Sequence, residues 1–207
     1  MNENTLPLRI VHKRLIRIII MLSLAMLTLP TTAQDLENET DFQLAKDRND
    51  ILLMQGTINS DTPAQLKAVL NTYPGITTIV MLYCPGSSDD EANFPMARAV
   101  RARGINTHLT STSDIASGCV DFFVAGSQRS MERGAKIGVH SWYDDDDQKN
   151  AIDYPTDSPE HELNRQYIEH MLGSDAFYWF TIYAAPADGM HYMTEQEITK
   201  YRLLTQY

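Results

Sequence analysis

The fold is decided by residues 107–126, THLTSTSDIASGCVDFFVAG. This stretch predicts a short strand followed by a helix. The strand is expected at Thr107–Thr110. The helix is expected over 116–126, where small and apolar residues indicate burial. Ser117 falls where the loop becomes the helix, and the first backbone N–H groups of a helix lack partners within it. The junction is therefore a candidate functional site.

The same alternation of strand and helix extends in both directions from this junction. Apolar or β-branched runs predict strands at 51–54 (ILLM), 76–83 (ITTIVMLY) and 136–140 (KIGVH). Cap and turn residues predict helices at 63–70, 89–103, 160–171, 175–183 and 194–201. Strands that alternate with helices favour a parallel sheet with right-handed crossover connections.

The composition is that of one packed domain. The chain has 207 residues, 43% of them hydrophobic and 21% charged, which is ordinary for a globular protein. Its formal net charge is −10. Because phosphate binding needs clustered Lys and Arg, this charge argues against a nucleic-acid partner.

The N-terminus predicts a signal peptide over residues 1–33. Basic residues precede the apolar run at 18–29 (IIIMLSLAMLTL), Pro30 ends that run, and cleavage is expected after Ala33. The alternative is an uncleaved membrane anchor, lengthened by Leu15 and Ile16. In either case the rest of the chain lies outside the cytoplasm, in the periplasm or secreted. Residues 34–49 are expected to be a linker or a frayed helix, and 50–207 the folded domain.

Two cysteines, Cys84 and Cys119, fall in the exported part of the chain. In an oxidising compartment such a pair is often a disulfide, and only one pairing is available. Two buried free thiols are the alternative, and the residues alone leave both open. The acidic run Asp144–Asp147 lacks the spacing of an EF-hand and is expected to be a solvated loop, so no metal is predicted.

Three segments together supply what a serine hydrolase requires: a hydroxyl nucleophile, a nearby base and donors for an oxyanion. Ser117 is exposed at a helix start, and His140 closes a predicted strand. The turn at 84–87 (CPGS) contains Gly86, which permits close approach of backbone to a ligand. Each feature has a structural alternative, because a Ser at a helix start is often a cap and a His at a strand end is often structural.

The order of these segments resembles the proteolytic subunit of Clp protease, from Ile51 to Leu204. The matching segments are 56–59 (GTIN), 83–87 (YCPGS), 114–119 (DIASGC) leading to Ala125-Gly126, 136–142 (KIGVHSW), and the ending around Tyr192, Glu197 and Tyr201. The resemblance implies an α/β fold, a ClpP/crotonase-like spiral of parallel β-strands with crossover helices. It extends to periplasmic relatives that also carry Cys near the nucleophile.

The resemblance also implies roles for individual residues. Ser117 matches the nucleophile and His140 the general base. The backbone N–H groups of Gly86 and Gly118 match the oxyanion hole.

Two positions depart from the family pattern. Ser87 stands where the family has a second glycine, and Met190 stands where it has the third catalytic residue, an Asp. Asp188 is the expected substitute, His191 is the other polar candidate, and a Ser-His dyad is a further alternative.

Three hypotheses about function follow from the resemblance. The first is an ATP-independent serine hydrolase, a peptidase without cofactor that acts on peptides or unfolded proteins. The second is a degenerate relative that binds or scaffolds without turnover. The third is a crotonase-like enzyme acting on an acyl thioester, disfavoured outside the cytoplasm, where coenzyme A is scarce. The aromatic segment 177–183 predicts either a homo-oligomer interface or a cap on the protein's own core.

Overall fold

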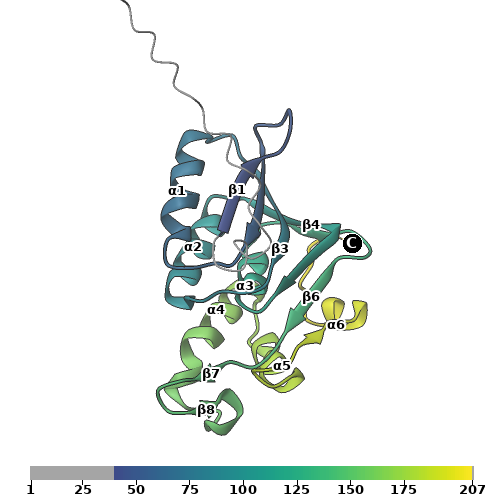
Figure 1. The fold of residues 1–207 in the computed structure, drawn as a ribbon. Coiled ribbons are helices and arrows are strands. Elements are labelled where there is room, and N and C mark those ends of the chain that lie inside the picture. The colour runs from purple at the N-terminus through teal and green to yellow at the C-terminus, as the bar shows by residue number, and fades with distance from the viewer. Residues whose placement is uncertain (1–39, 207) are drawn as a thin grey trace, which may run out of the picture. The chain divides into compact units, whose positions relative to one another are not determined.

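A seven-stranded sheet forms the centre of residues 40–206, which are the residues that the computed structural model describes (Figure 1). The strands lie in the order β1-β2-β3-β4-β6-β9, and β5 pairs with β4 beside this path. Their bounds are β1 Thr40–Leu44, β2 Ile51–Gly56, β3 Thr78–Cys84, β4 Asn106–Ala116, β5 Arg129–Met131, β6 Lys136–Val139 and β9 His191–Tyr192. A separate two-stranded sheet joins β7 Tyr143–Asp144 to β8 Lys149–Asn150.

The inner strands of the large sheet run parallel, and its two edge pairings are antiparallel. The parallel pairs are β2 with β3, β3 with β4, β4 with β5 and β4 with β6. Strand β1 pairs antiparallel with β2, and β9 pairs antiparallel with β6. This pattern confirms the predicted α/β class with a mostly parallel sheet.

Strand β4 is long enough to pair with two strands, β5 and β6, along the same edge. Its first half pairs with β5 through Thr107–Leu109, and its last three residues pair with β6 through Asp114–Ala116. The register of β4 with β3 shifts between Met81 and Tyr83. The sheet therefore turns along β4, and the end of β4 lies between β3 and β6.

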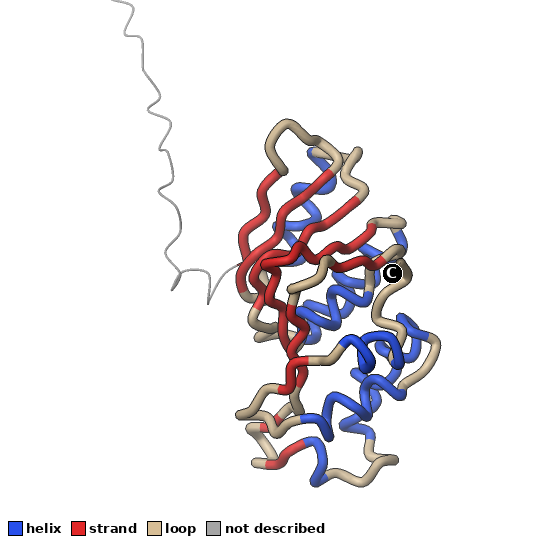
Figure 2. Tube along the Cα trace, turned by 90° about the vertical axis from the view of Figure 1, so that its right-hand side faces the viewer, coloured by secondary structure: helices blue, strands red, loops and turns tan. Residues whose placement is uncertain are grey.

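Most of the helices lie on one side of this twisted sheet, as Figure 2 shows. The bounds of the helices are α1 Thr62–Thr72, α2 Asp90–Ala102, α3 Gly118–Val124, η1 Ala151–Asp153, η2 Pro159–His161, α4 Glu162–Leu172, α5 Ala176–Ala184 and α6 Glu195–Lys200. Among residues 40–206, no helix is long and apolar enough to cross a membrane. The predicted signal peptide at 1–33 lies outside the described residues.

Helix α3 lies in the middle of the core. Phe122, Phe123 and Val124 are fully buried, and burying an aromatic side chain contributes about 1.5–3 kcal/mol. Tyr167 of α4 is also buried, and its hydroxyl donates to the Asp121 carbonyl at 2.6 Å. These contacts fix the helix that begins at the candidate nucleophile.

The structure corrects several predicted boundaries. The linker predicted over 34–49 is wrong for Thr40–Leu44, because this segment pairs along its length with β2. The buried Thr40 hydroxyl also donates to the Thr57 carbonyl at 2.6 Å. The strand predicted to end at Thr110 continues to Ala116, so the helix begins two residues later than expected, at Gly118.

Gly126 tests how tightly α3 is seated on β4. A Cβ atom there would lie 2.1 Å from Thr107 Oγ1 and 2.7 Å from the Thr107 backbone N. Because the backbone cannot yield easily, we expect Gly126→Ala to lower the free energy of unfolding by about 1–3 kcal/mol. The urea midpoint, with an unchanged m-value, measures this loss.

Gly75→Ala is the matched control, since the only atom near its added Cβ is the Asn49 carbonyl oxygen at 3.9 Å. The control is expected to stay within about 0.5 kcal/mol of wild type. Equal stability of the two variants would contradict the close packing of α3 on β4.

Candidate active site

Ser117 occupies a strained backbone position between β4 and α3. Its φ is 54° and its ψ is −135°, a region that residues with a side chain rarely adopt and that costs on the order of 1–3 kcal/mol. The Ser117 N–H donates to the Gly138 carbonyl at 3.0 Å, and the Ser117 carbonyl accepts from the Val120 N–H at 2.7 Å. The surrounding structure thus holds a sharp strand-to-helix turn that presents a half-buried serine, the geometry typical of a nucleophile.

The turn after β3 lies directly against this serine. A Cβ atom on Gly86 would stand 3.4 Å from Ser117 Cβ and 3.8 Å from Ser117 Oγ. The turn is tied to the chain after β2, because Ile58 N–H donates to the Gly86 carbonyl at 3.0 Å and Ser88 N–H donates to the Ile58 carbonyl at 2.8 Å. The Gly86 backbone is therefore held beside the serine side chain.

Gly118 is closely packed on the same turn. A Cβ atom there would stand 2.3 Å from Ser87 Cβ and 3.2 Å from Asp90 Oδ1. Among residues 40–206, neither the Gly86 N–H nor the Gly118 N–H has a hydrogen-bond partner. Two backbone donors beside the serine thus have no partner among these residues, and Gly118 lines the cavity that contains Ser117.

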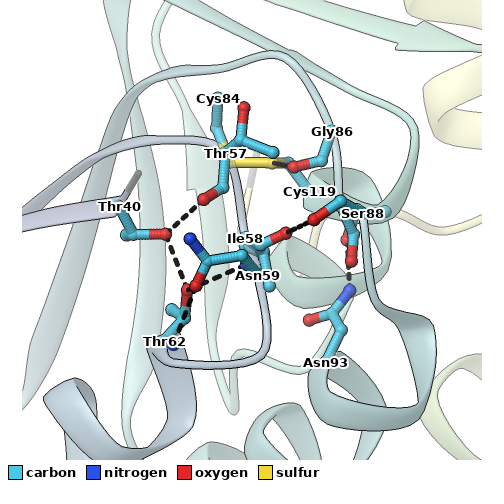
Figure 3. The surroundings of a disulfide bond; sticks show 12 residues. Thr40, Thr57, Ile58, Asn59, Thr62, Cys84, Gly86, Ser88, Asn93 and Cys119 are labelled. Carbon is cyan, nitrogen blue, oxygen red and sulfur yellow. Dashed lines mark hydrogen bonds between the residues drawn. A yellow bond between two sulfur atoms is a disulfide. The ribbon is translucent and has the colours of Figure 1, made fainter. Parts of the chain in front are cut away.

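A disulfide between Cys84 and Cys119 joins the turn to the helix (Figure 3). Cys84 is the last residue of β3 and Cys119 the second residue of α3, and both are fully buried. Their Cα atoms lie 5.9 Å apart across a sequence separation of 35. Of the two alternatives that the residues left open, the structure has the disulfide, which fixes the turn containing Gly86 relative to Ser117.

His140 directly follows β6, and the sheet brings it to the serine. Ala116 pairs with Gly138 in the β4–β6 register, so the residues that follow these strand ends lie close together. His140 is half-buried, and its Nδ1 lies 2.7 Å from the Ser141 carbonyl oxygen. A carbonyl only accepts, so Nδ1 carries the proton and Nε2 is left as the basic nitrogen.

Ser117 and His140 line one cavity, with an empty volume of about 540 Å³ including its open mouth. No hydrogen bond joins their side chains in the described part of the chain. Hydrogen bonds of catalytic groups are often long in the absence of substrate and shorten when it binds. The structure therefore brings together the two residues proposed from the sequence without closing the contact between them.

Asp188 is not brought to His140, so the prediction of an orienting carboxylate at this position is corrected. The Asp188 side chain is exposed, and His140 Nδ1 is held by the Ser141 carbonyl instead. The β6–β9 register pairs Val139 with His191, which leaves Asp188 in the turn before the strand.

Met190 and His191, which follow Asp188 in the chain, make contacts of their own away from His140. Met190 packs on β6, since a Cβ atom on Gly138 would stand 2.6 Å from its sulfur. His191, the other polar candidate, binds Glu197 through Nε2 and Oε2 at 3.0 Å. Neither of these contacts involves the imidazole of His140.

Two carboxylates that the sequence analysis missed, Asp90 and Asp121, line the same cavity. Burial raises the pKa of Asp121 well above its usual value, and the negative charge of Asp90 raises it further. Burial also raises the pKa of Asp90, against the opposing effect of hydrogen bonds from Ser87 and Asn164. The spacing of Asp121 four residues after Ser117, one helical turn, is the signal that could have indicated it.

Comparison with known proteins identifies the fold. No family model and no curated protein matches the chain. Among solved structures, a serine-to-alanine variant of the 1510-N membrane-bound stomatin-specific protease is 14% identical, with a TM-score of 0.50, over 72% of this chain and 75% of that chain. The fold is of the ClpP/crotonase type. A lysine-to-alanine variant of that protease, in complex with a substrate peptide, is 15% identical, with a TM-score of 0.47, over 72% of this chain and 71% of that chain.

The strained backbone angles at Ser117 lower the stability of the protein, and replacing Ser117 by glycine should remove this cost. Because glycine adopts its backbone angles without penalty, we expect Ser117→Gly to be about 1 kcal/mol more stable than Ser117→Ala, which keeps the strain. Both variants lack the Ser117 hydroxyl, so their difference in stability reports the backbone strain rather than the loss of the hydroxyl. Paired urea unfolding curves measure the difference.

Gly is more flexible than Ala in the unfolded chain, which works against this gain. A Ser117→Gly variant less stable than Ser117→Ala would therefore show that the strain at this turn is small, and would remove one argument for a functional role.

Proposed function

We propose that this protein is a serine hydrolase, and in finer terms a peptidase that works without ATP. Ser117 acts as nucleophile and His140 as general base. The observation that carries the proposal is the strained strand-to-helix turn, which holds Ser117 in one cavity with His140 and beside two unpaired backbone donors. The shared fold with a protease supports it, although likeness at 14% identity concerns the fold alone.

The geometry supports the following sequence of steps. Ser117 Oγ attacks the carbonyl carbon of the scissile bond while His140 Nε2 takes the hydroxyl proton. The Gly86 and Gly118 N–H groups donate to the oxyanion of the tetrahedral intermediate. The imidazolium then gives its proton to the leaving amine. Water, deprotonated by the same imidazole, releases the acyl group from Ser117 and restores the hydroxyl.

The Ser141 carbonyl takes over part of the work that an aspartate does in a triad. It fixes the ring orientation and keeps the proton on Nδ1. It carries no full charge, so it stabilises the imidazolium less than a carboxylate would. The arrangement therefore supports a dyad whose base is oriented but only weakly assisted.

A second candidate function is a binding protein that has lost turnover. It is favoured by the missing hydrogen bond between Ser117 and His140, and by Met190 at the position where the family has its aspartate. Export, signal cleavage after Ala33 and a homo-oligomer stay predictions, as does membrane attachment through an uncleaved N-terminus. Peptides or unfolded proteins are the proposed substrates.

Substitution of the proposed dyad tests the function. We expect Ser117→Ala and His140→Ala each to reduce peptide hydrolysis by about 10⁴-fold or more, and the double variant to be hardly worse than either single one, because members of a catalytic unit are not additive. Asp188→Asn should retain nearly full activity, since this side chain is exposed and does not touch His140. Hydrolysis of a fluorogenic peptide measures all four.

Ser111→Ala serves as the control, because it removes an exposed serine that does not line the cavity. Undiminished activity in Ser117→Ala would refute the nucleophile assignment. A correctly folded wild-type protein without activity toward any peptide would favour the binding protein instead.

A further inference from the structure

The cavity beside Ser117 contains a carboxylate that its surroundings do not neutralise. Asp121 lies on α3 one turn after Ser117, so both side chains face the same side of the helix and line the same cavity. Within residues 40–206, the Asp121 side chain has no hydrogen-bond or ion-pair partner. The proposed dyad does not use it.

Positive charge is missing from this cavity. Neither Lys nor Arg is among the residues that line it. The two arginines of α2, Arg98 and Arg101, are engaged elsewhere. Arg98 lies over the ring of Tyr167 at 5.3 Å, and Arg101 donates to the Val124 and Ala125 carbonyls at the end of α3.

Keeping Asp121 at this position makes folding less favourable. Its pKa is raised in the folded protein, so the unfolded chain releases the proton at lower pH than the folded chain does. Stability is therefore lost as the pH rises above the ordinary pKa of an aspartate, about 3.9, and toward the raised value. A cation entering the cavity would remove this penalty, because an opposite charge favours the ionised carboxylate.

The remaining lining suits a long cationic side chain. Val120, Ile168 and Phe177 offer apolar contact to a methylene stem. Asp90 stands beside the start of α3, 3.2 Å from where a Cβ of Gly118 would lie, and is held by Ser87 and Asn164. It adds a second negative charge near the first. Apolar walls with two carboxylates complement a lysine or arginine side chain and disfavour an acidic one.

We propose that this cavity is the specificity pocket of the site and binds the lysine or arginine side chain that precedes the cleaved bond, with Asp121 as its charged partner. The inference rests on the proposed function, because it assigns a substrate class to the same site. The ammonium or guanidinium group donates charge-assisted hydrogen bonds to the Asp121 carboxylate. The substrates are then peptides or unfolded segments with basic residues.

Two fluorogenic peptides that differ only in the residue before the coumarin test the proposal. One carries lysine and the other norleucine, which has a similar stem without the charge. We expect the wild-type enzyme to prefer lysine by roughly 10- to 100-fold in kcat/KM. In Asp121→Asn, which keeps the shape and removes the charge, the ratio should fall to near one. Asp157→Asn, an exposed aspartate outside the cavity, should keep the wild-type ratio.

Equal or faster cleavage of the norleucine peptide by the wild-type enzyme would overturn the pocket assignment while leaving the hydrolase intact. The wild-type comparison does not depend on how well any variant folds. Retention of the lysine preference in a folded Asp121→Asn variant would also overturn it.

Binding to Ser117→Ala separates this inference from the proposed function. Fluorescence anisotropy with labelled lysine and norleucine peptides reports binding without turnover. Tighter binding of the lysine peptide, lost on adding Asp121→Asn, would support the pocket even if the wild-type protein cleaves neither peptide. Equal binding of both peptides would refute it.

Discussion

The hydrogen bond from the Ser117 N–H to the Gly138 carbonyl is the contact on which the candidate site depends. It continues the β4–β6 ladder by one residue and forces the chain to turn sharply into α3. The disulfide between Cys84 and Cys119 holds the neighbouring turn against that helix. The candidate nucleophile, the candidate base and two backbone donors thus come from three segments, after β3, between β4 and α3, and after β6. They lie where three parallel strands end, which is the usual place for a site in an α/β fold.

The local pattern was enough to predict the alternating strands and helices, because each element depends on residues close in sequence. The assignment of Ser117 and His140 to one site rests instead on the resemblance to Clp protease, and the structure places both residues at one cavity. Residues whose role depends on distant pairing were not predictable. Strand β1 could not be found because its polar residues become a strand only beside β2. The resemblance favours Asp188 as the orienting carboxylate, with His191 or a dyad as alternatives, but the β6–β9 register leaves Asp188 in a turn. The Ser141 carbonyl leaves no sequence signal, since every residue has a carbonyl.

Features that lower stability gather at this one place. Ser117 has strained backbone angles, and Asp121 has an unpaired carboxylate next to Asp90. The rest of the core offsets them, above all the fully buried aromatic residues of α3 and Tyr167. Backbone strain and a carboxylate with a perturbed pKa, without a structural benefit, are typical of functional sites. Their location in one cavity is therefore a stronger argument for function than the fold, which is shared by proteins of different activities.

Mass spectrometry of the protein after reaction with a fluorophosphonate, which labels only an activated serine, tests directly whether Ser117 is the nucleophile. We expect one adduct per chain, located on the peptide that contains Ser117, and loss of labelling after heat denaturation. A folded protein that stays unlabelled with excess probe, or an adduct on a different serine, would contradict the assignment of Ser117 as nucleophile.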